Sequence, residues 1–241
     1  MTAKAARRVP MHAWLPRAAF LAASLLVLPV RADSVKRPVQ GFTKVELHVP
    51  LDLTIRPGKD FSLVLDLRDS DNASKISTEV RGDTLVVTTT EHSLHLRGKN
   101  TLALTMPEFR GVAIYGSGDV TVEGFERSGD VAFSISGSGD VAYTGKSSAM
   151  TVSIAGSGNV SLTGSTGSLS VSIEGSGDLK AADFSTKNAS VEVDGSGDAE
   201  LHVAGGAVQF AVNGSGDIRW SGEASAVSAV TRGSGSIQKR H

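Results

Sequence analysis

The sequence contains no cysteine, so its fold cannot depend on disulfide bonds and it lacks the residue that would carry a lipid anchor. Aromatic residues are scarce, with two Trp and two Tyr, which argues against a large aromatic ligand cage. The apolar run over residues 18–30 is shorter than the ~20 residues that a membrane-spanning helix needs. By contrast, the chain is rich in Gly, Ser, Val and Thr. Because β-branched residues favour strands and Gly punctuates them, this composition predicts an all-β protein.

The first 32 residues are typical of a signal peptide. A basic start precedes the apolar run over 18–30, and Val30-Arg31-Ala32 supplies a small-x-small cleavage pattern before Asp33. The basic residues before the apolar run are Lys4, Arg7, Arg8 and Arg17. We therefore expect an exported protein, located in the periplasm, in the cell envelope or outside the cell, with no stable membrane span after cleavage. The alternative is an N-terminal membrane anchor that is left in place.

Removal of the leader makes the remaining chain acidic. The leader holds five of the 24 basic residues and no acidic ones, which leaves 19 basic against 25 acidic side chains. Nucleic-acid binding needs clustered Lys and Arg, so we expect no nucleic-acid partner.

An internal repeat predicts the architecture. The tripeptide Gly-Ser-Gly occurs seven times at spacings of 19 to 21 residues, with its first Gly at positions 116, 137, 156, 175, 195, 214 and 233. A unit of this length cannot bury its apolar side alone, but stacked copies enclose a continuous core. The repeat therefore predicts a single-stranded parallel β-helix with 19–21 residues per rung, right-handed as is usual for parallel crossovers.

Apolar residues flank each repeat at even offsets, which place them on one face of a strand. Those before each Gly-Ser-Gly are Val112, Ile114, Phe133, Ile135, Val152, Ile154, Val171, Ile173, Val191, Val193, Phe210 and Val212. Those after it are Val120, Val122, Val141, Tyr143, Val160, Leu162, Leu179, Ala181, Ala199, Leu201, Ile218 and Trp220. Each rung is thus two short strands that meet at a glycine corner, followed by a turn at Gly124, Gly145, Gly164 or Gly222. The last copy is more polar, with Ala229, Thr231, Ile237 and Lys239, and is expected to cap the stack.

The remaining segments complete the predicted domain organisation. Residues 33–41 form a linker, and residues 42–237 form one solenoid domain, followed by a tail over 238–241. Within the domain, 42–110 are irregular N-terminal rungs and 111–237 are regular repeats. A separate small β-domain over 39–110 is the alternative. The one segment long enough for a sizeable flap is 66–76.

Four stretches of the sequence together are similar to a known pattern. They are the opening Phe42-Thr43-Lys44-Val45-Glu46-Leu47, Gly82-Asp83-Thr84-Leu85-Val86-Val87, the stretch over 102–115 and the repeats that begin with Gly116-Ser117-Gly118-Asp119-Val120. With these residues the sequence resembles the putative auto-transporter adhesin, head GIN domain family, over about residues 40–237. The resemblance implies a β-helix in an exported bacterial protein of largely unknown function.

The most specific candidate site is an acidic ladder, formed by the residue that follows Gly-Ser-Gly in successive rungs. It consists of Asp119, Asp140, Asn159, Asp178, Asp198 and Asp217. Like charges one rung apart repel, so a Ca²⁺ ion could bridge the aspartates. The simpler interpretation is that each side chain caps its own corner through a nearby backbone N–H. We favour the simpler interpretation and expect no metal and no cofactor.

Other candidate residues have structural explanations. The serine of each Gly-Ser-Gly recurs in every rung, which is typical of structure and not of a catalytic nucleophile. Arg81-Gly82-Asp83 spells a cell-attachment tripeptide, but a turn between two strands explains it. His92 and His95 are three residues apart, a spacing that in a strand sends side chains to opposite faces, so we do not expect them to share a metal. Tyr115 and Trp220 could stack on sugar rings if exposed, and Trp220 is expected in the core.

No catalytic constellation stands out, so we expect a non-catalytic, adhesin-like or cell-envelope binding or structural module. Its flat repetitive faces suit a glycan or a protein surface. One alternative is a carbohydrate-active β-helix enzyme, which needs a cluster of carboxylates and basic groups in one groove. The other is an envelope-stress or regulatory accessory protein.

Overall fold

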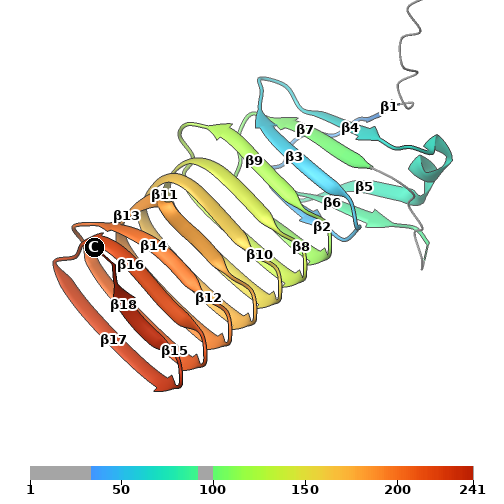
Figure 1. Cartoon of the computed structure of the whole chain (residues 1–241). Coiled ribbons are helices and arrows are strands. Elements are labelled where there is room, and N and C mark those ends of the chain that lie inside the picture. Colours follow the sequence, from blue (N-terminus) through green and yellow to red (C-terminus); the bar gives the residue numbers. More distant parts are fainter. Residues whose placement is uncertain (1–33, 92–99, 241) are drawn as a thin grey trace, which may run out of the picture. The chain divides into compact units, whose positions relative to one another are not determined.

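The computed structural model describes residues 34–91 and 100–240, which lie within one compact unit, Arg31–His241. Almost every element of this unit is a strand, and successive coils stack along one axis (Figure 1). The all-β prediction and the parallel β-solenoid prediction are confirmed. The predicted leader lies outside the described residues.

Two sheets face each other across the core. From β8 onward, the first sheet contains β8 (Gly111–Gly116), β10 (Asp130–Gly137), the second halves of β11 (Val141–Gly156), β12 (Val160–Gly175) and β13 (Leu179–Gly195), β15 (Ala207–Gly214) and β17 (Ala226–Gly233). The second sheet contains β9 (Val120–Phe125), the first halves of β11 to β13, β14 (Ala199–Ala204), β16 (Asp217–Glu223) and β18 (Ser236–Lys239). All these pairings are parallel and bring equivalent repeat positions together, as in Ile135, Ile154 and Ile173.

The N-terminal part continues both sheets in an order that differs from the order of the chain. In the first sheet, β2 (Lys44–Leu47) lies between β6 (Thr84–Thr89) and β8. In the second sheet, β3 (Asp52–Pro57) lies between β7 (Thr101–Met106) and β9. The first rung of the chain is therefore inserted between two later ones.

Three N-terminal strands pair antiparallel. They are β1 (Ser34–Arg37), β4 (Ser62–Asp66) and β5 (Ile76–Arg81). The first lies in the segment predicted as a linker over 33–41, and the other two lie in the segment predicted as irregular rungs over 42–110. The connection from β5 to β6 is only two residues long, which can join antiparallel strands but not parallel ones. Gly82 in this connection has a φ of 63°, as a tight hairpin requires. The Arg81-Gly82-Asp83 tripeptide is therefore a hairpin turn, as predicted.

A short 3-10 helix closes the N-terminal end of the core. The helix η1 (Ser70–Lys75) leads from β4 in the second sheet to β5 in the first (Figure 1). Its first turn is capped by Asp69, whose carboxylate accepts a hydrogen bond from the Asp71 backbone N–H at 3.2 Å. Asn72 and Ala73 are buried, and Leu67 and Ile76 belong to the core. The predicted flap over 66–76 is wrong, because burial of its apolar residues holds this segment against the core.

The side chains predicted to face inward form the core. In the six complete repeats, all of them are 7% exposed or less. Trp220 is among them and packs against Phe210 with ring centroids 5.9 Å apart, so its assignment to the core is confirmed. The rung that contains Ala229, Thr231, Ile237 and Lys239 is the last one of the stack, and it also exposes two apolar side chains, Val227 and Val230 on β17.

The Gly-Ser-Gly corners allow neighbouring coils to approach closely. A Cβ atom on Gly158 would overlap the carbonyl oxygen of Gly139 in the preceding rung, so only glycine fits there. The turn predicted at Gly145 and Gly164 does not interrupt the strands. These two glycines pair with each other, and β11 and β12 continue through them, because the ladder of parallel pairings is maintained around this corner.

Candidate functional site

The acidic ladder joins one rung to the next. The Oδ1 atom of each ladder residue accepts a hydrogen bond from the backbone N–H of the equivalent residue in the following rung, at 2.8–3.1 Å. The residues that accept are Asp119, Asp140, Asn159, Asp178, Asp198 and Asp217, and the series ends at Ser236. The prediction that each side chain caps its own corner was wrong in this detail, because stacking brings the next corner's N–H within reach.

The ladder carboxylates have protein partners. Arg219 donates to Asp198 at 2.8 Å and to Asp217 at 2.6 Å. The Ser236 hydroxyl, followed by its backbone N–H and the Arg219 charge, lowers the pKa of the Asp217 carboxyl. Over residues 34–91 and 100–240, no group of three acidic or histidine side chains is arranged to hold a metal ion. The ladder therefore has a structural role in joining the coils.

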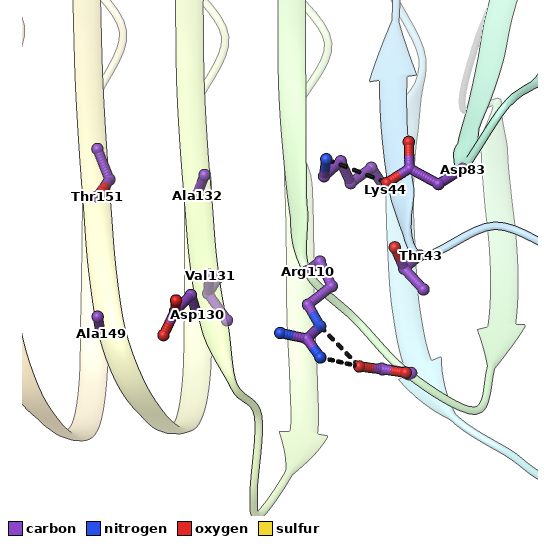
Figure 2. A pocket seen from close by; sticks show the side chains of 10 residues that line it. Thr43, Lys44, Asp83, Arg110, Asp130, Val131, Ala132, Ala149 and Thr151 are labelled. Carbon is purple, nitrogen blue, oxygen red and sulfur yellow. Dashed lines mark hydrogen bonds and ion pairs between the residues drawn. The ribbon is translucent and has the colours of Figure 1, made fainter.

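A trough lies on the outer face of the first sheet, where β2, β8, β10 and β11 run side by side. Its volume is about 590 Å³, and Figure 2 shows the side chains that line it. They are Thr43, Lys44, Asp83, Glu108, Arg110, Asp130, Val131, Ala132, Ala149 and Thr151. A smaller hollow of about 130 Å³ continues it along β2, β8 and β10.

The floor of the trough is low because its residues have short side chains. Gly111 and Ala113 on β8 lie beside Ala132 and Ser134 on β10. A Cβ atom on Gly111 would overlap the carbonyl oxygen of Ala132, so no larger side chain fits at position 111 unless β10 moves. Longer side chains, such as Lys44 on β2, form the rim.

Five charged residues line the trough, namely Lys44, Asp83, Glu108, Arg110 and Asp130. Lys44 Nζ lies 3.1 Å from Asp83, and this contact is the first cause of a lowered pKa of the Asp83 carboxyl. Arg110 Nε donates to Glu108 Oε1 at 2.6 Å (Figure 2). The Asp130 backbone belongs to the β10–β11 pairing, but its carboxylate makes no hydrogen bond or ion pair with side chains or backbone of residues 34–91 and 100–240. The trough therefore presents two ion pairs and one unpaired carboxylate.

An exposed aromatic pair lies on the same sheet face. Tyr115 follows Ala113 by two residues on β8, so both side chains point outward. Tyr115 is 45% exposed, and its ring stacks on the ring of His48, the residue that follows β2, with centroids 4.4 Å apart and planes 9° apart. His48 Nε2 also lies 3.5 Å from Glu46. Each ring therefore covers one face of the other.

Sequence reasoning singled out Tyr115 but missed the trough. Its residues come from five separate segments of the chain. Only the insertion of β2 beside β8 brings Lys44 and His48 next to Gly111 and Tyr115. The alternation of Lys44, Glu46 and His48 is a sequence signal for an outward strand face, but it does not show which strand lies beside that face. His92 and His95 lie outside the described residues.

The serines of the Gly-Ser-Gly corners do not form a catalytic arrangement. Within the described ranges, the one hydrogen bond between a serine hydroxyl and a histidine ring joins Ser221 to His202, and Ser221 is not a corner serine.

The described residues also contain no helix that is long and apolar enough to span a membrane.

Comparison with known proteins identifies the family. Residues 41–224 match the model of the family described as putative auto-transporter adhesin, head GIN domain. Among solved structures, a putative adhesin from Bacteroides fragilis is 20% identical, with a TM-score of 0.81, and the match covers 86% of this chain and 96% of the other. A putative lipid binding protein from Parabacteroides distasonis is 19% identical, with a TM-score of 0.67, and the match covers 88% and 98%.

A third structure has a similar fold at lower sequence identity. It is a putative adhesin from Parabacteroides merdae, 14% identical, with a TM-score of 0.65 and a match over 88% of this chain and 98% of the other. At these identities the likeness establishes the fold alone. A search of curated proteins finds no match. Because the family model covers most of the chain, this protein belongs to the head GIN domain family.

Proposed function

We propose that this protein is an exported, non-catalytic, adhesin-like module that binds an extended glycan in the trough on the first sheet. The observation that carries the proposal is the combination of a low floor, at Gly111 and Ala132, with ion pairs along the lining and the Tyr115–His48 stack on the same face. The family description, which names an adhesin, supports the same class of function.

The chemistry of the trough suits sugar hydroxyls. A carboxylate accepts hydrogen bonds and a guanidinium donates them, so the pair Glu108–Arg110 can engage neighbouring hydroxyls of one sugar ring. Asp130 offers two further acceptor atoms. The Tyr115 ring can pack against the apolar face of a sugar while its hydroxyl stays in water. The trough is shallow and open, which favours a chain that lies along the surface over a small enclosed ligand.

The enzyme alternative receives less support. Glycoside hydrolysis uses two carboxyl groups, one acting as an acid and the other as a nucleophile or a base. In the trough, Glu108 is bound to Arg110 and Asp83 is bound to Lys44. That leaves Asp130 as the unpaired carboxylate, so the second group is missing from the described lining. The accessory-protein alternative predicts a protein ligand and no glycan binding.

A glycan-array screen followed by titration tests the proposal. We expect Ala132→Trp to weaken binding by about tenfold or more, because the indole fills the trough. The matched control is Ser190→Trp, which lies at the same register position three rungs further along the first sheet. Equal binding by both variants, or no glycan binding by the parent chain, would overturn the proposal.

Export has its own test. Residues 1–32 have the basic start, apolar run and small-x-small pattern of a leader. N-terminal sequencing of the protein recovered from cells should begin at Asp33. An N-terminus at Met1 or Thr2 in the recovered protein would contradict export by this route.

A further inference from the structure

The C-terminal end of the solenoid leaves a rung uncovered. All eight residues of β17 are exposed, and Val227 and Val230 are 53% and 46% exposed. One rung earlier, Val208, which pairs with Val227, is 1% exposed. The edges of β17 and β18 that face away from the stack make no pairing with the described residues (Figure 1). Such an edge is a template for another strand.

The opposite end is closed. At the N-terminal end, η1 crosses from one sheet to the other and buries Ala73 against the core. Arg37 Nη2 donates to the Ala73 carbonyl oxygen at 2.5 Å, which fixes this cap to β1. If two copies stacked head to tail, the open C-terminal end of one copy would therefore meet the closed N-terminal end of the other. This asymmetry argues against copies stacked head to tail.

The acidic ladder indicates what kind of strand fits the open end. Each inner rung offers a side-chain oxygen to the N–H of the next parallel rung, and in the last such bond the Ser236 backbone N–H donates to Asp217 Oδ1 at 2.9 Å. The Ser236 hydroxyl donates back to Asp217 at 2.8 Å. A further parallel rung would therefore find no carboxylate at its corner. An antiparallel strand does not need this contact.

Charges at the open end are largely balanced within the chain. Lys239 lies 3.4 Å from Glu223, and Arg240 lies 2.9 Å from Glu200. Arg219 is held by two aspartates, and Arg232 reaches Asn213 at 3.5 Å. Two such ends can approach each other without strong repulsion, because most cations already have an acidic partner.

We infer that the occupant of this end is a second copy of the chain, joined tail to tail about a two-fold axis through antiparallel pairing of its C-terminal rung. A two-fold contact closes the assembly at a dimer and covers both open ends at once. In an antiparallel pair, side chains that lie opposite each other share one face of the sheet. Val227 and Ala229 of one copy would therefore lie next to inward-facing side chains of β17 in the second copy.

The size of the end face sets the expected affinity. A strand of eight residues is about 26 Å long and the sheets lie about 10 Å apart, which gives about 260 Å² per copy. Stable complexes bury ~800 Å² per partner, so the dimer should be weak and should depend on concentration.

Sedimentation of the protein purified after expression of the full chain tests this inference. The dimer fraction should rise with concentration, and Val227→Arg should raise the dissociation constant by about tenfold or more, because each copy then places a charge on the apolar edge. Circular dichroism should be unchanged, since β17 is already exposed. A monomer at every concentration, or a dimer unaffected by Val227→Arg, would overturn the inference.

Cross-linking identifies the surface independently. The chain has no cysteine, so Ser228→Cys on β17 introduces a single thiol. The matched control is Ser190→Cys, which occupies the equivalent position two rungs earlier. A short bismaleimide should link the first variant into a covalent dimer and leave the second largely monomeric. Equal cross-linking of both, or species larger than a dimer, would contradict the two-fold contact.

Discussion

The Oδ1 atom of Asp178 accepts a hydrogen bond from the backbone N–H of Asp198 at 2.9 Å, which ties one corner of the solenoid to the next. Without this bond, the Asp198 N–H would lose its partner at a partly buried corner. We expect Asp178→Ala to lower the free energy of unfolding by about 1–2 kcal/mol. Urea denaturation measures this. Asp178→Asn is the matched control and should cost much less, because Asn159 makes the same bond in this chain. Equal loss in both variants would show that the carboxylate charge, and not the hydrogen bond, matters.

Acid should weaken the ladder. The pKa of the Asp217 carboxyl is lowered in the folded protein, first by the Ser236 hydroxyl. A carboxyl with a lowered folded pKa stabilises the fold above its unfolded value of about 3.9 and loses that contribution as the pH falls through the folded pKa. We therefore expect stability to drop below about pH 4, and to drop less in Asp217→Asn. The urea midpoint at neutral pH and at about pH 3 gives the comparison. The same drop in both proteins would exclude this role for Asp217.

Calcium should leave the stability unchanged. One oxygen of each ladder carboxylate, Oδ1, already accepts a backbone hydrogen bond, and Arg219 neutralises two of the carboxylates. A ligand that binds the folded state raises the melting temperature by mass action. We expect no shift of the melting temperature with millimolar Ca²⁺ or with a chelator. A rise with Ca²⁺ that the Asp140→Ala variant lacks would instead support the bridging-ion hypothesis.

The corner at Gly158 should tolerate no side chain. A Cβ atom there would overlap the Gly139 carbonyl oxygen and also approach Ile135. We expect Gly158→Ala to lower the free energy of unfolding by about 3 kcal/mol, because the two rungs must move apart. Thermal unfolding measures the loss. Ser157→Ala at the neighbouring exposed position is the control and should be nearly neutral.

The repeat made the regular part of the fold predictable. Val152, Ile154 and Val160 lie at even distances from the first Gly of their repeat, which places them on one strand face. That face is buried if identical rungs stack in parallel, and all three side chains are buried. The inward position of Trp220 followed from the same count. The ladder residues were also predictable as corner residues, but the partner of each one was not. That partner belongs to the next rung, and its distance depends on how closely the coils stack.

Local sequence determined the composition of each rung, the glycine corners and the side chains that face inward, because these depend on the two-residue period of a strand and on repetition along one chain. The position of β2 between β6 and β8 could not be obtained in this way, since it depends on long-range pairing. That pairing creates the trough and sets His48 against Tyr115. The candidate binding surface therefore arose from contacts between segments that no local pattern connects.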